Sequence, residues 1–399
     1  MKDRESLMRE RRGKERKLTC MKRKIWKCLS MLGIVTITTT GLVACQEKPT
    51  TEAGLRIGMV TDAGTIDDKS FNQGTWEGIV QYADEHDHVE KNYVQPADAT
   101  TQAFVEAIDN LILSGHNVIV TPGFAFEEAI GQVQSNYPEV RFILIDGQPL
   151  VGQDENEQPI YEIGENTVSL SFSEHEAGFL AGVASALESK QGKLAYLGGV
   201  PVPAVQKLGW GFVSGVAYAN QMFGTEAQVV DYLYQGTFTE TQAGKTIAGG
   251  MYDKGIDIIF AAAGAVGVGA INETKTRVES GAELYVVGVD VDQYEEGRLT
   301  DGRSVILTSA VKQLGHATYQ MLDAIANDEF SGGEALVMDL TLNGVGLPTE
   351  NPNLSEETLE KVQQTIEAIQ QGQVVVPNSL ETLEAYLQTC NYSVEGLTY

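Results

Sequence analysis

The sequence predicts an α/β protein made of two doubly wound, parallel-sheet domains, joined by a hinge, with a ligand cleft between them. Short apolar runs alternate with longer amphipathic segments along residues 55–327, which is typical of strands followed by helices. The apolar runs are hydrophobic throughout, as expected for parallel strands that helices cover on both faces. A length of 399 residues allows two or three domains, and 42 glycines against 11 prolines fit many tight strand–helix turns.

The first half of this alternation begins with the apolar run LRIGMV at 55–60. Turn residues bound the run, so it predicts a buried strand. The segment 70–85 follows with helical spacing of its apolar residues, and Asp68 or Ser70 can cap it. The other elements of this half are strands over 91–95, 117–121 and 141–145 and helices over 101–114 and 125–135.

The second half repeats the pattern. Strands are predicted over 193–198, 227–233, 257–262 and 284–289. Helices are predicted over 173–188, 204–221, 241–254, 266–280 and 309–327, with an acidic helical tail from 354. We therefore expect a first domain over 55–170 plus about 310–345, a second over 171–309, and a C-terminal helical extension over 346–399.

The N-terminal residues 1–44 are typical of a secretory signal. The basic stretch MKRK at 21–24 precedes an apolar run at 29–37 that is too short to span a bilayer. The sequence LVAC at 42–45 matches the bacterial lipobox, and this resemblance implies diacylglyceryl modification of Cys45 and cleavage before it.

The segments beside this signal complete the prediction for the N-terminus. The polar stretch 45–54 suits a tether between a lipid anchor and the folded body. Residues 1–20 carry charges of both signs and precede a good basic region, so Met21 is an alternative initiator. We expect a lipid-anchored protein at the extracytoplasmic face of the cell membrane.

Charge and cysteine content exclude several classes of protein. The net charge is −27, and residues 1–44 hold 12 of the 28 basic residues but only 4 of the 55 acidic ones. The strongly acidic remainder repels nucleic acid, which is bound through clustered Lys and Arg. Cys390 is the one cysteine beyond residue 45, and no CxxC or Cys/His metal spacing occurs, so neither a disulfide framework nor a metal site is expected.

Polar residues follow several predicted strands at the point where each apolar run ends. Asp62, Asp146 and Asp290 lie at such points, as does Gly264, and Lys312 lies near a later predicted strand, ILTS at 306–309. Ligands of open α/β sheets bind at the carboxyl ends of the strands. Three carboxylates and one ammonium from both halves of the chain therefore predict a polar cleft between the domains.

Four segments resemble the basic membrane protein family, the lipoprotein substrate-binding components of ABC transporters that are related to the purine nucleoside receptor. They are TDAGTIDDKSFNQ at 61–73, AAAGAVGVGAI at 261–271, VVGVDVDQ at 286–293 and TSAVKQLGHA at 308–317. The resemblance is collinear over about 55–345. It implies a type I periplasmic-binding-protein fold, a nucleoside ligand and a permease partner. The polar stretch LVGQDENEQPI, which begins at Leu150, looks like an insertion at a domain edge.

The resemblance also implies how the base is held. Phe71 matches the first of two rings that enclose the base, and Asn72 in the same motif is an expected ligand contact. Asp146 matches the aspartate at the polar edge of the base. Phe238 is our choice for the second ring, with Trp210 as the alternative.

On the ribose side the resemblance implies Asp62, Gly264, Asp290 and Lys312. Three of these residues also have a purely structural interpretation. Asp290 and Lys312 can form an ion pair without a ligand, and Gly264 can serve a turn.

The motifs of several enzyme classes are absent from the sequence. It contains no GxxxxGK[ST] phosphate loop, no GxGxxG dinucleotide fingerprint and no Ser/His/Asp or Cys/His constellation. These absences indicate no catalysis, and we expect a non-enzymatic, monomeric protein that needs no cofactor. The resemblance implies a binding lipoprotein that captures purine nucleosides for import. A binding lipoprotein for another polar solute such as a sugar, and a surface adhesin, stay open as alternatives.

Overall fold

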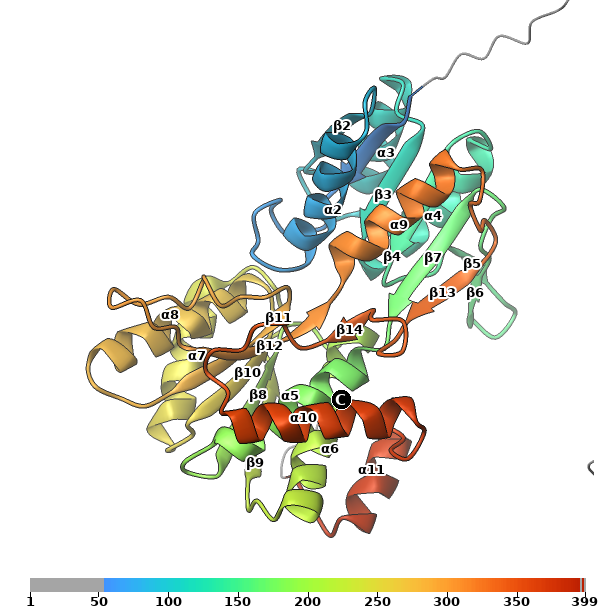
Figure 1. The fold of residues 1–399 in the computed structure, drawn as a ribbon. Helices are drawn as coiled ribbons and strands as arrows, with labels where there is room; N and C mark the ends of the chain where they lie inside the picture. Colours follow the sequence, from blue (N-terminus) through green and yellow to red (C-terminus); the bar gives the residue numbers. More distant parts are fainter. Residues whose placement is uncertain (1–53, 395–396, 398–399) are drawn as a thin grey trace, which may run out of the picture. The chain divides into compact units, whose positions relative to one another are not determined.

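A computed structural model describes residues 54–394 and 397 of the chain (Figure 1). The predicted signal peptide, the predicted lipid-modification site Cys45 and the predicted tether before Gly54 lie outside the described residues. No described helix combines the length and apolar character that a membrane span requires. The described part contains two six-stranded sheets and one two-stranded hairpin.

The first sheet has the strand order β13-β7-β4-β3-β1-β2, and all its neighbours pair in parallel. Its strands are β1 (Arg56–Val60), β2 (Glu90–Val94), β3 (Val118–Pro122), β4 (Arg141–Ile145), β7 (Thr167–Phe172) and β13 (Ala335–Met338). Its helices are α2 (Phe71–Glu85), α3 (Thr101–Leu113), α4 (Glu127–Val133) and α9 (Leu314–Ala326), with short 3-10 turns η1 (Phe124–Phe126) and η2 (Gln134–Asn136).

Strand β4 shows why the apolar runs are continuous. Ile143 and Ile145 belong to one buried cluster, whereas Phe142 and Leu144 belong to a second. Side chains of a strand alternate between faces, so both faces of this sheet are covered by apolar layers.

The second sheet has the order β14-β12-β11-β10-β8-β9 and is parallel except for β14, which pairs antiparallel with β12. Its strands are β8 (Lys193–Gly198), β9 (Gln228–Tyr234), β10 (Ile258–Ala262), β11 (Tyr285–Asp290), β12 (Ile306–Lys312) and β14 (Val345–Gly346). Its helices are α5 (Glu174–Glu188), α6 (Pro203–Phe223), α7 (Thr241–Asp253) and α8 (Ala265–Glu279).

Close helix packing in this part depends on glycine. A Cβ atom at Gly178 or Gly182 of α5 would collide with backbone carbonyl oxygens of α6. The converse holds for Gly211 and Gly215 of α6, which face carbonyl groups of α5. These positions let the two helix backbones approach directly.

The chain crosses between the two sheets three times, after β7, after β12 and after β13. We call residues 54–172 with α9 and β13 the first lobe, and α5 to β12 with β14 and the C-terminal helices the second lobe. The C-terminal helices are α10 (Glu356–Gln370), which lies against α5, and α11 (Leu380–Thr389), which lies against α6 (Figure 1).

One segment differs from the sequence-based expectation, and a second, for which the sequence predicted no element, forms strands. The helix predicted over 309–327 begins only at Leu314, because β12 continues through position 310 to Lys312 in the second sheet. The polar insertion after residue 150 forms an ordered hairpin of β5 (Leu150–Gln153) and β6 (Pro159–Tyr161).

Candidate functional site

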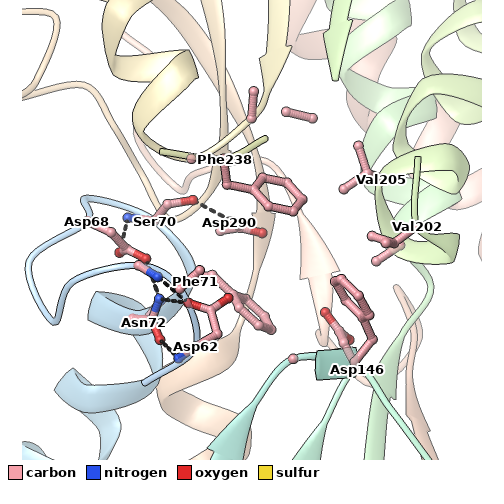
Figure 2. Close-up of a pocket in the computed structure, with 18 of the residues that line it drawn as sticks. Asp62, Asp68, Ser70, Phe71, Asn72, Asp146, Val202, Val205, Phe238 and Asp290 are labelled. Atoms are coloured by element: carbon pink, nitrogen blue, oxygen red, sulfur yellow. Dashed lines mark hydrogen bonds between the residues drawn. The ribbon is translucent and has the colours of Figure 1, made fainter. Parts of the chain in front are cut away.

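A cavity of about 440 Å³ opens between the two lobes, at the carboxyl ends of β1, β3 and β4 on one side and β10, β11 and β12 on the other. Figure 2 shows side chains from both lobes pointing into it. The residues predicted to bind ligand all line it, namely Asp62, Phe71, Asn72, Asp146, Phe238, Gly264, Asp290 and Lys312. Trp210, the alternative second ring, lies in α6 and is not among the lining residues. The predicted cleft is therefore present with Phe238 in its wall.

A buried charged cluster forms the floor of the cavity. The Nζ atom of Lys312 lies 2.7 Å from Oδ2 of Asp146 and 3.2 Å from Oδ1 of Asp290. The three side chains are only 4%, 7% and 11% exposed. Burial alone would lower the pKa of Lys312, but the surrounding carboxylates Asp146, Asp290 and Glu174 hold it above its ordinary value, so the lysine stays charged.

Both aspartates adopt a backbone conformation that is uncommon for residues other than glycine. The φ angle is +55° at Asp146 and +67° at Asp290, where β4 and β11 end. Left-handed backbone at such positions is tolerated best by Gly, Asn and Asp, and it concentrates at functional sites. The turn directs each carboxylate across the strand ends toward Lys312.

The hydrogen-bonding capacity of this cluster is not filled. Oδ1 of Asp146 is buried and has no hydrogen-bond partner among the described residues. Oδ2 of Asp290 accepts a hydrogen bond from the hydroxyl of Ser70, at the start of α2. An unpartnered buried carboxylate oxygen is costly, so Asp146 offers a ready acceptor for an N–H or O–H group of a ligand.

The loop before α2 is held by a second set of carboxylates. Asp68 accepts from the backbone N–H groups of Ser70, Asn72 and Gln73 at 2.9–3.1 Å, which caps the helix as the sequence predicted. The side-chain amide of Asn72 donates to both Asp62 and Asp68 at 2.8 Å (Figure 2). Both donors of Asn72 are thus engaged, so it positions the two carboxylates and has no N–H left for a ligand.

Asp62 occupies the mouth of this loop. Its Oδ1 accepts from the backbone of Gly64 at 2.7 Å as well as from Asn72. Burial raises the pKa of Asp62, while the hydrogen bonds from Asn72 and Gly64 act in the opposite direction. Its second oxygen accepts no hydrogen bond from the described residues, and Asp62 lines the cavity.

Aromatic rings line the cavity above the charged floor. The ring centroid of Phe71 lies 4.4 Å from Nζ of Lys312, a cation–π contact that fixes both groups. Phe238 lies over Gly199 and Gly264, and a Cβ atom at Gly199 would collide with its ring. Figure 2 shows Phe71 and Phe238 reaching into the same space. Two flat faces above a polar floor suit a ligand that is flat at one end and rich in hydroxyl groups at the other.

Sequence reasoning missed several groups at this site. Phe124 and Tyr161 line the cavity from the first lobe. Phe124 follows the end of β3, and applying the strand-end argument to that strand as well would have found it. Tyr161 lies on the hairpin. The polar composition of the stretch before it did not indicate that this segment would contribute a side chain to the cavity.

Glu174, another missed residue, lies outside the cavity lining. Its carboxylate is 2% exposed and lies 3.4 Å from Nζ of Lys207. Burial, and next the charge of Asp146, raise the pKa of Glu174 to about 7, whereas Lys207 and Lys312 oppose the shift. Glu174 therefore exchanges a proton near neutral pH beside the charged floor.

Comparisons with known proteins agree with this architecture. A sequence profile described as "Bmp: ABC transporter substrate-binding protein PnrA-like" matches residues 56–379. The CD4+ T-cell-stimulating antigen of Listeria monocytogenes is 31% identical over 332 residues, which cover 80% of this chain and 87% of the relative. The ABC transporter nucleoside-binding protein BmpA of Lactococcus lactis is 28% identical over 333 residues, covering 81% and 89%.

The fold has a close structural counterpart. The crystal structure of an ABC transporter system solute-binding protein from Aeropyrum pernix K1 matches with a TM-score of 0.70 at 22% identity, covering 85% of this chain and 98% of that chain. This likeness confirms the predicted fold, that of the type I periplasmic binding proteins, with two mostly parallel sheets on either side of a cleft.

Proposed function

Because this chain belongs to the Bmp family of PnrA-like ABC transporter substrate-binding proteins, we propose that it captures purine nucleosides outside the membrane and delivers them to the permease of an importer. Membership of this family makes the protein a binding component that holds a solute for a permease and not an enzyme. The choice of nucleoside as the solute rests on the chemistry of the cleft.

One observation carries the proposal. The buried Asp146–Lys312–Asp290 cluster lies beneath aromatic rings, and Oδ1 of Asp146 has no partner among the described residues. A nucleoside presents a flat base, an edge of N–H groups and vicinal hydroxyls, and each finds a counterpart here. Aromatic stacking on a base contributes about 1–3 kcal/mol.

The polar groups divide between the two ends of such a ligand. Asp146 Oδ1 accepts the ring N–H of guanine or hypoxanthine. Asp290 and Lys312 bind the ribose hydroxyls, with Asp62 and the backbone at Gly264 nearby. Because Lys312 also contacts Asp146, one connected cluster recognises both base and sugar.

The same cluster favours a neutral ligand. Lys312 is already shared by Asp146 and Asp290, and Glu174 lies behind them. A phosphate group would meet more carboxylates than ammonium groups in this cavity, and like charges brought together in a buried site repel strongly. A nucleoside therefore suits the site better than a nucleotide.

Two further observations support the proposal. The Lactococcus lactis relative is named as a nucleoside-binding protein. The lipobox at Cys45 predicts a lipid anchor, which would keep the binding protein at the outer face of the membrane beside its permease.

The test is a calorimetric titration of the protein carrying Cys45→Ala, which keeps the preparation free of lipid. The ligands are guanosine, inosine, adenosine, uridine, ribose and arabinose. We expect saturable binding of the purine nucleosides and none of the free sugars at the same concentrations. Chromatography of the recovered ligand should show an unchanged nucleoside.

The alternatives give different results in the same experiment. Tight binding of a free sugar without nucleoside binding would establish the sugar-receptor alternative. Absence of binding to every ligand in the panel, by a protein with a cooperative thermal unfolding transition, would reject the nucleoside proposal. Release of free base from the nucleoside would indicate catalysis, which would contradict the non-enzymatic role of the family.

A further inference from the structure

The β5–β6 hairpin extends the first lobe toward the mouth of the cleft. Asp154 orders its turn, because its carboxylate accepts from the backbone N–H groups of Asn156 and Gln158 at 2.8 and 2.9 Å. A Cβ atom at Gly131 of α4 would collide with the carbonyl of Leu150, so helix and hairpin are in direct backbone contact. The hairpin is thus a fixed part of the lobe.

The base of the hairpin is tied to the same helix region a second time. Gln134 donates to the carbonyl oxygen of Glu162 at 2.8 Å and accepts from the backbone of Gly164 at 2.9 Å. Glu162 in turn donates its backbone N–H to Pro149 at 3.0 Å. These contacts fix the strand that carries Tyr161.

The last residue of β6 faces the ligand cavity and its neighbour does not. Tyr161 lines the cavity and is 45% exposed. Ile160 is similarly exposed, at 43%, but it is not among the lining residues. Successive side chains of a strand point to opposite faces, so the strand turns Tyr161 toward the cavity and Ile160 away from it.

Phe124 and Glu127 join Tyr161 in this outer part of the cavity. Both lie beside the base-edge position, since a Cβ atom at Gly147 would come within 3.0 Å of Glu127 Cγ and 3.3 Å of Phe124 Cα. Glu127 accepts the backbone N–H of Gln148 at 2.9 Å, which ties η1 and α4 to the turn after Asp146. The segment that carries Phe124 therefore adjoins the turn after Asp146, the residue that we assign to the base.

The second lobe presents an apolar surface to the same space. Val202 and Pro203, at the start of α6, line the cavity together with Val205 (Figure 2). Phe124 is 39% exposed. Partly exposed rings from one lobe and aliphatic groups from the other thus bound one concave space, and such surfaces become buried when a flat apolar group enters.

We propose that Tyr161 and Phe124 form an outer aromatic wall of the cleft, which packs against the end of the purine base that lies furthest from the ribose. This inference rests on the proposed function, because it takes Asp146 to bind the N–H edge of the base. A purine carries that edge further from its sugar than a pyrimidine does. The wall thus extends the base site beyond Asp146, and neither ring lies in the four segments that carry the resemblance to the family.

The test compares variants at two adjacent positions of β6. Tyr161→Ala should weaken guanosine binding by roughly 5- to 50-fold, since it removes a ring from the base, while Tyr161→Phe keeps the affinity within about twofold. Ile160→Ala is the matched control, because it truncates an equally exposed side chain on the opposite face of the same strand. It should leave the affinity unchanged. Calorimetry measures all four proteins, and thermal unfolding verifies that each is folded.

A second measurement does not depend on truncation. Tyr161→Trp places a reporter ring in the wall, and guanosine should change the fluorescence of this variant relative to the parent protein. Ile160→Trp should show no such added change. Equal guanosine affinity in Tyr161→Ala and the parent, or equal responses of the two tryptophan variants, would overturn the outer wall. Failure of the parent protein to bind any nucleoside would instead overturn the proposed function.

Discussion

The Nζ atom of Lys312, at the end of β12, lies 2.7 Å from Oδ2 of Asp146, at the end of β4, so an ion pair joins the two lobes across the floor of the cleft. Asp290 contacts the same ammonium group from the strand beside it. One ammonium group thus serves two buried carboxylates. Loss of Lys312 leaves both carboxylates without a countercharge, and removing one partner of a buried pair costs more than the pair itself stabilises.

Removal of either second-lobe member should abolish tight binding. We expect Lys312→Ala and Asp290→Ala to weaken nucleoside binding by roughly 30-fold to several thousand-fold, corresponding to about 2–5 kcal/mol for one partner of a buried charge-assisted bond. Titration calorimetry measures the loss. Lys361→Ala is the control, because its ion pair with Glu357 in α10 lies outside the cavity lining. If both cleft variants bound nucleoside as tightly as the parent protein, the assignment of the ribose to this cluster would be wrong.

Replacement of Asp146 by Asn should change selectivity more than affinity. The structure sharpens the reason, because Lys312 should hold the amide oxygen at the position of Oδ2 and so turn the NH₂ group toward the ligand. An N–H donor then faces the ring N–H of guanosine and inosine, whereas adenosine offers an acceptor nitrogen. We expect guanosine and inosine to lose about tenfold or more relative to adenosine. Competition titrations with the three purines measure this ratio, and an unchanged ratio would move the base edge away from Asp146.

Glu174 should make the stability of the protein depend on pH. Burial first, and then Asp146, raise the pKa of its carboxyl from 4.5 to about 7. A raised carboxyl pKa means that the folded state prefers the protonated form. The contribution of this proton to the free energy of unfolding is complete below pH 4.5 and is lost as the pH rises through about 7.

The side chain of the variant Glu174→Gln does not titrate, so this variant should not lose stability as the pH rises from 4.5 to about 7. The free energy of unfolding of Glu174→Gln relative to the parent should therefore increase between pH 5 and 8, by up to about 3 kcal/mol. Urea unfolding of both proteins across this range measures it. His175, adjacent in α5, has a pKa lowered to about 4 by burial and by Lys207, so it stays neutral throughout. A difference that is constant with pH would show that Glu174 does not titrate there.

Cys45 lies outside the described residues, and its role as the lipid attachment site is a prediction from the lipobox. Cys45→Ala should transfer the protein from the membrane fraction to the supernatant, because no described helix could replace the anchor. Fractionation followed by immunodetection measures the distribution. The parent chain and Lys361→Ala should both stay with the membranes. Retention of Cys45→Ala there would contradict the lipobox assignment.

Much of the site could be predicted from the sequence because its residues lie where strands end. The runs before Asp62, Asp146 and Asp290 are apolar on both faces, so their ends are sharp, and parallel strands bring those ends to one edge. The hydrogen bond between Ser70 and Asp290 could not be predicted from the sequence, since it joins residues 220 positions apart in two different lobes. The start of α9 could not be predicted either, because residues 309–312 complete a strand whose apolar pattern fits a helix equally well.

The hairpin and the buried acid escaped for different reasons. Tyr161 directly follows the polar stretch 150–160, and it is positioned at the cleft through the pairing of β5 with β6. Glu174 is an ordinary first-turn residue of a helix in the sequence, where an acid is favoured by the helix dipole. Its 2% exposure comes from the packing around it, which no local pattern records.

The left-handed backbone at Asp146 and Asp290 also restricts how this protein can evolve. With φ at +55° and +67°, these positions accept Asn or Gly far more easily than β-branched or bulky residues. Aspartate and asparagine codons differ by a single nucleotide, so a lineage could exchange an acceptor for an amide in one step without remaking the turn. The rings of the hairpin and η1 carry no such backbone restriction. Substitutions that favour new ligands should therefore accumulate first at the aromatic positions. Positions 146 and 290 in the floor of the cleft should change only among the few residue types that tolerate a left-handed backbone.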